Sequence, residues 1–356
     1  MSDHIGRRKF LRKAGVSGIV GACLPPSSMA GLLSACSSAS PGGAETRLGE
    51  IVWTRQGRFL STENAPLWRS QHCGMVSVLP WENDTYRMFL TGKEPGSGFQ
   101  IGWLDLSRDL EVIHENPDNP VLRAGRVGTF DYLGLCMPLV VRVTDSVLYM
   151  YYVGWGPRDA RIFQNNAGLA ISRDNGNTWK RWSEASFLPL DDRDPFGTGT
   201  VFVMREDVGH WRLWYTSIRP WSTTDGRLQP NYHIRYAESE DGIHWTKPED
   251  NIILDLEGAE CCVARPMVIK EAGGYRMWFS RRGHRFSYRI GYAESADGRH
   301  WVRKPIDLEP SESGWDSEMI EYAWVLKEGA EYLMFYNGNG FGRSGTGTMK
   351  GRVKSG

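Results

Sequence analysis

The chain has 356 residues, with 42 Lys and Arg against 42 Asp and Glu. Five of the basic residues and one acid lie in the first 36 positions, so the remaining chain is slightly acidic and no nucleic-acid partner is expected. No apolar run reaches the roughly 18 to 20 residues of a membrane-spanning helix, and the aromatic content of 12% indicates a packed core.

The first 36 residues are typical of an export signal. Residues 6–12 resemble a twin-arginine motif, a weakly apolar stretch follows, and residues 33–36 resemble a lipobox that ends at Cys36. Cys36 is therefore the predicted lipidation site, and residues 37–49 are predicted to be a flexible tether. We expect export by the twin-arginine route to the periplasm or cell surface, with only the lipid anchor in the membrane. Cleavage after Ala30 is the alternative and would release a soluble product.

Residues 50–356 are predicted to form one domain that contains a β unit repeated five times. An aromatic, β-prone pattern recurs at intervals of about 57 to 64 residues. It occurs at residues 86–90, 148–152, 211–215, 275–279 and 332–336. Each copy follows a turn and an earlier apolar run, which predicts a β-hairpin.

Two further segments complete each predicted unit. A strand that runs into an Asp/Gly turn is predicted at 101–109, 168–179, 234–245 and 290–301. Short apolar edges are predicted as fourth strands at 119–122, 187–190, 251–254 and 305–308. Five four-stranded units arranged radially give an all-β fold, a five-bladed β-propeller.

Two sets of residues in the repeats are predicted to be structural. The turn acids Asp174, Asp241 and Asp297 recur at one position, which favours capping of backbone N–H groups over an active-site cluster. Cys73, Cys136, Cys261 and Cys262 have no zinc-type spacing, so we predict buried small side chains and no metal site. No cofactor can be assigned, and a structural cation or a cation in the central funnel of the fold stays open as an alternative.

Acids recur just before the predicted inner strands. They are Asp131, Asp194, Glu260 and Glu318. Because inner strands surround the central funnel of a propeller, we expect these acids to converge there. Mutual repulsion would raise some of their pKa values, which suits acid–base chemistry.

Of these acids, Asp131 is predicted to bind substrate, and other polar residues beside them are predicted to do the same. Asp316 and Glu321 extend an acidic segment around Glu318, where capping of a loop and pairing with Arg is the structural alternative. Arg265, Arg281 and His233 are candidates to moderate the repulsion. For His233, as for His72, a hydrogen-bonded core position is the alternative.

Over about residues 50–350 the chain resembles the five-bladed propellers of glycoside hydrolase families 43, 32, 68 and 130. It is most similar to exported or polysaccharide-cluster proteins labelled "family 32 N-terminal-like". Segments 232–239, 314–322 and 336–342 carry this resemblance, and 172–179 matches the sialidase Asp-box, which is a fold device.

Two short motifs extend the resemblance to family 32. Arg193-Asp194-Pro195 resembles its RDP motif and Glu260-Cys261 its Glu-Cys motif. The resemblance implies that Asp194 holds substrate hydroxyls and that Glu260 is the general acid. The nucleophile motif of the first unit is absent, because residues 68–75 contain no carboxylate.

These features predict an exported carbohydrate-active protein that acts on a glycan, with a glycoside hydrolase as the expected activity. Glu260 would be the general acid, with Asp194 or Glu318 as the base or the hydroxyl-holding partner. The missing acid of the first unit favours an alternative, a glycan-binding lipoprotein without catalysis. A transferase or phosphorylase on the same fold is the third interpretation, and the sugar, the linkage and the stereochemical outcome stay open.

Overall fold

The computed structural model describes residues 48–156, 164–224 and 226–354. The predicted signal, Cys36 and nearly all of the predicted tether lie outside these residues, so they stay predictions. Within the described ranges no helix is long and apolar enough to cross a membrane.

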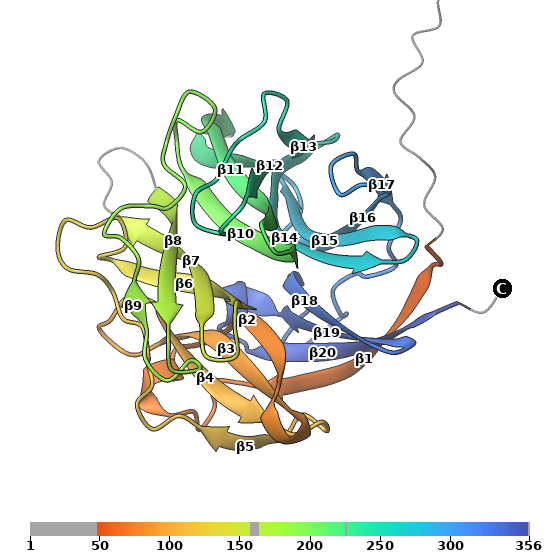
Figure 1. The fold of residues 1–356 in the computed structure, drawn as a ribbon. Coiled ribbons are helices and arrows are strands. Elements are labelled where there is room, and N and C mark those ends of the chain that lie inside the picture. The colour runs from red at the N-terminus through yellow and green to blue at the C-terminus, as the bar shows by residue number, and fades with distance from the viewer. Residues whose placement is uncertain (1–47, 157–163, 225, 355–356) are drawn as a thin grey trace, which may run out of the picture. The chain divides into compact units, whose positions relative to one another are not determined.

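The described residues form four sheets that divide into five units of four strands each (Figure 1). Strands within a unit are antiparallel, and a single parallel bridge between Tyr232 and Cys262 joins the third and fourth units into one eight-stranded sheet. Unit 1 contains β2 (His72–Trp81), β3 (Thr85–Lys93), β4 (Gln100–Leu106) and β5 (Val112–Glu115). Unit 2 contains β6 (Gly134–Arg142), β7 (Leu148–Gly156), β8 (Gln164–Ser172) and β9 (Lys180–Arg181). Unit 3 contains β10 (Thr198–Asp207), β11 (His210–Thr224), β12 (Arg227–Ser239) and β13 (Ile252–Leu254).

The last two units complete the fold. Unit 4 contains β14 (Glu260–Glu271), β15 (Gly274–Gly283), β16 (Arg289–Ser295) and β17 (Val302–Lys304). Unit 5 contains β18 (Glu321–Glu328), β19 (Glu331–Asn337), β20 (Thr346–Val353) and, from the other end of the chain, β1 (Ile51–Leu60). Short 3-10 turns lie at Leu67–Arg69 (η1), Glu82–Asp84 (η2) and Asn339–Gly342 (η3).

The five first strands form a closed ring. β2 contacts β6, β6 contacts β10, β10 contacts β14, β14 contacts β18, and β18 contacts β2. Each unit extends outward from this ring through its second, third and fourth strands. The predicted all-β class is therefore confirmed, and the five aromatic segments are the second strands β3, β7, β11, β15 and β19.

Three of the four predicted outer strands are wrong. Only 251–254 overlaps a fourth strand, β13, whereas β5, β9 and β17 precede the predicted edges. The apolar residues of those edges fill the core from loops, since Leu122, Leu188 and Leu308 are buried. The true outer strands β5, β9 and β17 are mostly exposed and carry charges, as edge strands commonly do, so they lack an apolar pattern.

The Asp/Gly turns and the cysteines have the predicted structural roles. Asp241 Oδ1 accepts hydrogen bonds from the backbone of Ile243 and His244, both at 2.8 Å, while Gly242 has φ of 76°. Asp297 and Asp174 cap their turns in the same way. Cys73, Cys136, Cys261 and Cys262 are free and buried.

Each first strand has a β-bulge at the same point, where its pairing with the second strand shifts. The bulged residue has positive φ in four units; these residues are Met75, Met137, Arg265 and Tyr322. Unit 3 has Gly199 at this point. A bulge re-aims side chains, so these five positions ring the axis of the fold.

Side chains of the preceding unit hold these bulges in place. The backbone N–H of Met137 donates to Thr91 Oγ1 at 2.9 Å, and that of Tyr322 donates to Ser280 Oγ at 2.9 Å. The N–H of Met75 donates to Asn337 Oδ1 at 3.0 Å. Each of these bonds crosses from one unit to the next, so the inner ring is fixed by polar contacts as well as by apolar packing.

Candidate functional site

A cavity of about 850 Å³ lies at the inner ring. Four of the five bulge positions line it: Met75, Met137, Gly199 and Tyr322. All five units contribute to its wall, which places it on the axis of the fold. Its volume falls within the range of small-molecule sites in proteins, roughly 300 to 1,000 Å³.

Six aromatic rings line the wall, and every unit provides at least one. They are Phe99, Trp155, Tyr232, Tyr288, Tyr322 and Phe341. The rings contact one another along the wall, with centroids of Phe99 and Trp155 at 6.0 Å and those of Tyr288 and Phe341 at 6.0 Å. Rings placed in this way offer flat apolar faces to a ligand.

The charged residues of the wall are all basic. Lys93, Arg282 and Arg343 line the cavity, and no Asp or Glu does so within the part of the chain that the structure describes. Four of the wall residues lie three positions after the aromatic segment of a second strand: Lys93, Trp155, Ile218 and Arg282. This recurring position is the signal by which the sequence could have revealed the site.

His72 anchors the loop that carries Phe341 and Arg343. Its ring is buried, with Nδ1 3.1 Å from the carbonyl of Thr91 and Nε2 2.6 Å from that of Phe341. Burial lowers the pKa of His72; the contacts with the carbonyls of Phe341 and Thr91 oppose this shift, and the charges of Lys93 and Arg343 add to it to a smaller extent. His72 therefore holds one side of the cavity in place. It occupies a hydrogen-bonded core position, which was the alternative to a site role in the sequence analysis.

The acids predicted to be catalytic or substrate-binding do not converge on this cavity. Asp131, Asp194 and Asp316 are each buried inside their own unit, against the tyrosine that ends the aromatic pattern of the second strand. The hydroxyls of Tyr152, Tyr215 and Tyr336 donate to them at 3.0, 2.8 and 2.9 Å respectively. Burial raises the pKa of each of these tyrosines, and the adjacent carboxylate raises it further.

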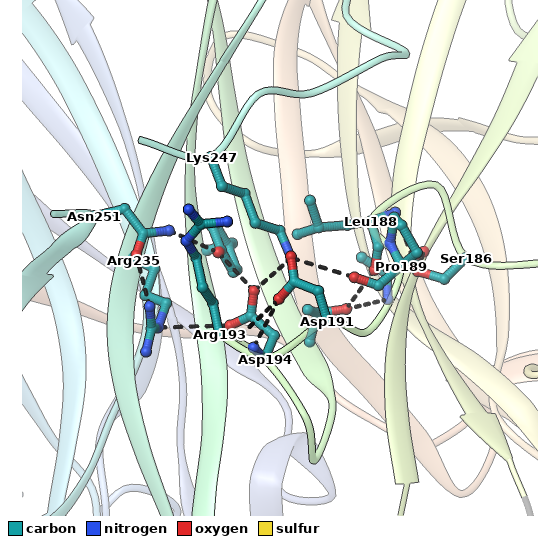
Figure 2. A network of polar contacts seen from close by, with 12 residues as sticks. Ser186, Leu188, Pro189, Asp191, Arg193, Asp194, Arg235, Lys247 and Asn251 are labelled. Atoms are coloured by element: carbon teal, nitrogen blue, oxygen red, sulfur yellow. Dashed lines mark hydrogen bonds and ion pairs between the residues drawn. The ribbon is translucent and has the colours of Figure 1, made fainter. Parts of the chain in front are cut away.

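A cation from the outer part of the unit completes each of these contacts. Arg181 Nε lies 2.8 Å from Asp131, and Arg55 Nε lies 3.5 Å from Asp316. Asp194 contacts Lys247 Nζ at 2.6 Å and Arg235 Nε at 3.5 Å (Figure 2). The recurring acid thus joins the loop before the first strand to the second strand and the outer edge. We call this arrangement the unit latch.

Units 1 and 4 have variants of the unit latch. In unit 4 both oxygens of Glu260 accept from Arg303 Nη1 at 3.0 Å, and Arg281 Nη1 is 3.8 Å away. In unit 1 the charges are exchanged: Arg69 precedes the first strand and contacts Glu115 on β5 at 3.0 Å. The latch explains why acids recur before the inner strands, and it places Glu260 outside the wall of the axial cavity.

The other predicted site residues lie in three different surroundings. Glu318 is exposed, and its backbone N–H donates to Asn339 Oδ1 at 2.8 Å. His233 is buried and accepts from Arg235 Nε at 2.9 Å, and burial lowers its pKa to about 4. Arg265 is buried and does not line the cavity; its Nη2 donates to the carbonyl of Val76 at 2.9 Å, and burial lowers its pKa to about 10.

Glu321 is the one predicted acid that adjoins the wall. It precedes Tyr322 at the start of β18 and is fully buried, and neither carboxyl oxygen has a hydrogen bond to any described residue. Burial raises its pKa well above the ordinary value, and the neighbouring Tyr322 hydroxyl and Arg282 charge oppose that rise only in part. A protonated carboxyl can donate a hydrogen bond or a proton where an ionised one cannot.

Glu321 should make the stability of the protein depend on pH. Its pKa is higher in the folded than in the unfolded chain, so stability falls as pH rises above the unfolded value of about 4.3 toward the folded value. In the wild-type protein the free energy of unfolding should fall with a limiting slope of about 1.4 kcal/mol per pH unit. The Glu321→Gln variant should not show this decrease. Urea unfolding of both proteins from pH 4 to 8 measures it. Parallel curves for the two proteins would contradict the buried, protonated state.

No metal centre is evident around these residues. Across the described ranges, no group of three or more His, Cys, Asp or Glu side chains is arranged to hold a metal ion.

The fold is that of known glycoside hydrolases. A solved BT0996 RGII complex is similar with a TM-score of 0.64, covering 85% of this chain and 92% of the other at 16% identity. A thermostable family-43 glycoside hydrolase is similar with a TM-score of 0.56, covering 79% of this chain and 88% of the other at 16% identity. A structure from a study of GH130 mannoside phosphorylases and hydrolases gives 0.57, covering 87% and 92% at 13% identity. At these identities the likeness shows the fold.

Relatives at higher identity define the family. No family model matches the chain. The "Uncharacterized protein" MT1551 and its counterpart Rv1502, from two strains of Mycobacterium tuberculosis, are each 36% identical to it over 304 residues. The matched segment covers 83% of this chain and 98% of theirs. The chain belongs to the family of these mycobacterial proteins.

Proposed function

We propose that the protein binds a carbohydrate in its axial cavity. The observation that carries the proposal is the cavity wall, in which each of the five units presents an aromatic ring. Apolar rings combined with a few polar groups are the usual lining of a small-molecule site. Structural neighbours named as glycoside hydrolases support a carbohydrate as the ligand.

The arrangement of acids argues against the paired-carboxylate hydrolysis that we expected from the sequence. That mechanism needs two carboxyls about 5 to 10 Å apart around the scissile bond. The described wall of the cavity contains no Asp or Glu, while Asp194 and Glu260 are engaged in unit latches. Binding without cleavage, the alternative left open by the sequence, therefore becomes the first proposal.

Glycoside cleavage stays as a second candidate because of Glu321. A buried carboxyl that stays protonated beside a ligand cavity has the property required of a general acid. In this second proposal Glu321, in place of Glu260, would be the proton donor, and the base would be a water molecule or another group.

A glycan array followed by calorimetry on the chain from residue 48 onward tests the binding proposal. The Trp155→Ala variant should bind the selected glycan about 30-fold more weakly, since a central aromatic anchor contributes about 2 kcal/mol. Phe341→Ala, on an exposed loop, gives a second variant without a threat to the core. Trp182→Ala is the matched control, because Trp182 is exposed and lies outside the cavity.

The same protein preparations distinguish a carbohydrate-binding protein from a glycoside hydrolase. Binding without release of reducing ends supports a binding protein. Release that Glu321→Gln abolishes supports the hydrolase, and release that persists in this variant would exclude Glu321 as the acid. If no glycan binds to the wild-type protein, or if Trp155→Ala and Phe341→Ala bind as the control does, the axial cavity is not a carbohydrate site.

A further inference from the structure

We propose that the carbohydrate bound in the axial cavity carries an acidic substituent: the carboxylate of a uronic acid, or a sulfate or phosphate ester. This inference rests on the proposed function. It concerns Lys93, Arg282 and Arg343, which we call the cavity cations.

The cavity cations come from three different units and meet at one cavity. Lys93 ends β3 of unit 1, Arg282 lies near the end of β15 of unit 4, and Arg343 follows η3 in unit 5. Because these three elements are far apart in sequence, the ring closure brings their charges together. A ligand in the cavity would therefore meet positive charge from more than one side.

No carboxylate forms an ion pair with any of the cavity cations among the described residues. Lys93 Nζ lies over the ring of Phe99 at 5.5 Å, and Arg282 donates from Nη2 to Cys262 Sγ at 3.2 Å. The Nε of Arg282 is buried and has no hydrogen-bonding partner in the described chain. Arg282 is half-buried, and a cation removed from water without an anionic partner is costly unless a ligand supplies one.

Cations elsewhere in the fold are treated differently. Arg69, Arg181, Lys247 and Arg303, which are also shielded from water, each contact a carboxylate at 3.0 Å or less. Arg265 is an exception, since it is buried without a carboxylate partner and donates to the carbonyl of Val76. The contrast is therefore between the cations of Arg69, Arg181, Lys247 and Arg303, which are paired with carboxylates, and the cavity cations, which are not.

The unmatched charge suits an acidic saccharide. Aromatic rings can contact the sugar faces, while guanidinium and ammonium groups form charge-assisted hydrogen bonds to an anionic substituent. A neutral saccharide would displace water from the cavity and leave the three positive charges there without a compensating negative charge. Selection of the acidic ligand would then come from the cavity cations and the orientation of the sugar from the rings.

Calorimetry with matched saccharides tests this inference. The probes are an oligogalacturonide, its carboxyl-reduced neutral counterpart, and sulfated and phosphorylated forms of that neutral oligosaccharide. We expect the acidic forms to bind at least 10-fold more tightly than the neutral one at 50 mM salt, with the difference shrinking at 500 mM. The strongest of the three acidic forms identifies the substituent.

Charge-removing variants assign the effect to the cavity cations. Arg282→Gln, Lys93→Gln and Arg343→Gln should each weaken binding of the acidic form about 10- to 100-fold, the range for one hydrogen bond to a charged group. Binding of the neutral form should change by less than about twofold. Arg173→Gln and Lys180→Gln, at exposed positions outside the cavity, are the matched controls. Lys93 and Arg343 are not core residues, so their variants keep the test valid if Arg282→Gln fails to fold.

The outcomes separate this inference from the function on which it rests. Equal binding of acidic and neutral forms, or acidic binding that all three variants retain, overturns the inference and leaves a carbohydrate site. Absence of binding by every saccharide overturns the proposed function and the inference with it. If free inorganic phosphate or sulfate binds but no saccharide does, the proposed function and the inference are likewise overturned.

Discussion

Replacing Asp194 with Ala is expected to lower the free energy of unfolding by about 3 to 5 kcal/mol, because removal of one partner leaves the others buried and uncompensated. The carboxylate is fully buried and contacts Tyr215, Lys247 and Arg235. Urea unfolding followed by tryptophan fluorescence measures the loss. Asp192→Ala is the control, because Asp192 is exposed two residues away.

The same variant separates the unit latch from the role predicted by the family 32 resemblance. A latch residue should affect stability in the absence of any ligand. A residue that only holds substrate hydroxyls should affect binding or turnover, with a free energy of unfolding close to that of Asp192→Ala. The latter result would restore Asp194 as a site residue.

Removing β1 is expected to have an even larger effect. A chain that begins at Ser61 should lose more than about 5 kcal/mol of its free energy of unfolding, which corresponds to a fall in Tm of more than about 8 °C. β1 pairs with β20 at eight positions, and Trp53 contacts Trp278 of unit 4 and Tyr332 of unit 5, with ring centroids at 6.0 and 6.3 Å. Calorimetry on chains that begin at Leu48 and at Ser61 makes the comparison.

An added peptide tests whether the missing strand itself is responsible. A synthetic peptide of residues 48–60 should bind the shortened chain and recover part of the lost Tm. An unchanged Tm in the chain from Ser61 would show that the β1–β20 pairing contributes little to stability.

Much of the fold could be predicted from the sequence because the second strands carry a strong local signal. Their aromatic residues repeat at nearly constant intervals and are buried between units, as for Tyr151, Trp214 and Trp278. The outer strands could not be located in this way, since β5, β9 and β17 lie at exposed edges without an apolar pattern. The partner of β20 was also missed, because nothing local to 51–60 indicates pairing with the far end of the chain.

The site was harder to predict because its chemistry is not local. Acids before each inner strand suggested a catalytic funnel, yet a side chain such as Asp131 can turn into its own unit as easily as toward the axis. Only the contacts with Tyr152 and Arg181 decide its direction. The aromatic and basic wall residues come from strand ends and loops of five units, so the closed ring is needed before they form one cavity.

Unit 5 combines a strand from the beginning of the fold, β1, with three strands from its end, and this affects the order in which the strands can pair during synthesis. β1 leaves the ribosome first, and β20, with which it pairs, leaves last. At about 5 to 20 residues per second, the interval is on the order of tens of seconds, whereas a hairpin forms in about microseconds. The strands of units 1 to 4 can pair as they emerge, but β1 must wait as an open edge. The ring can therefore close only after β20 has emerged, and until then residues 51–60 stay accessible to a chaperone that recognises extended chain.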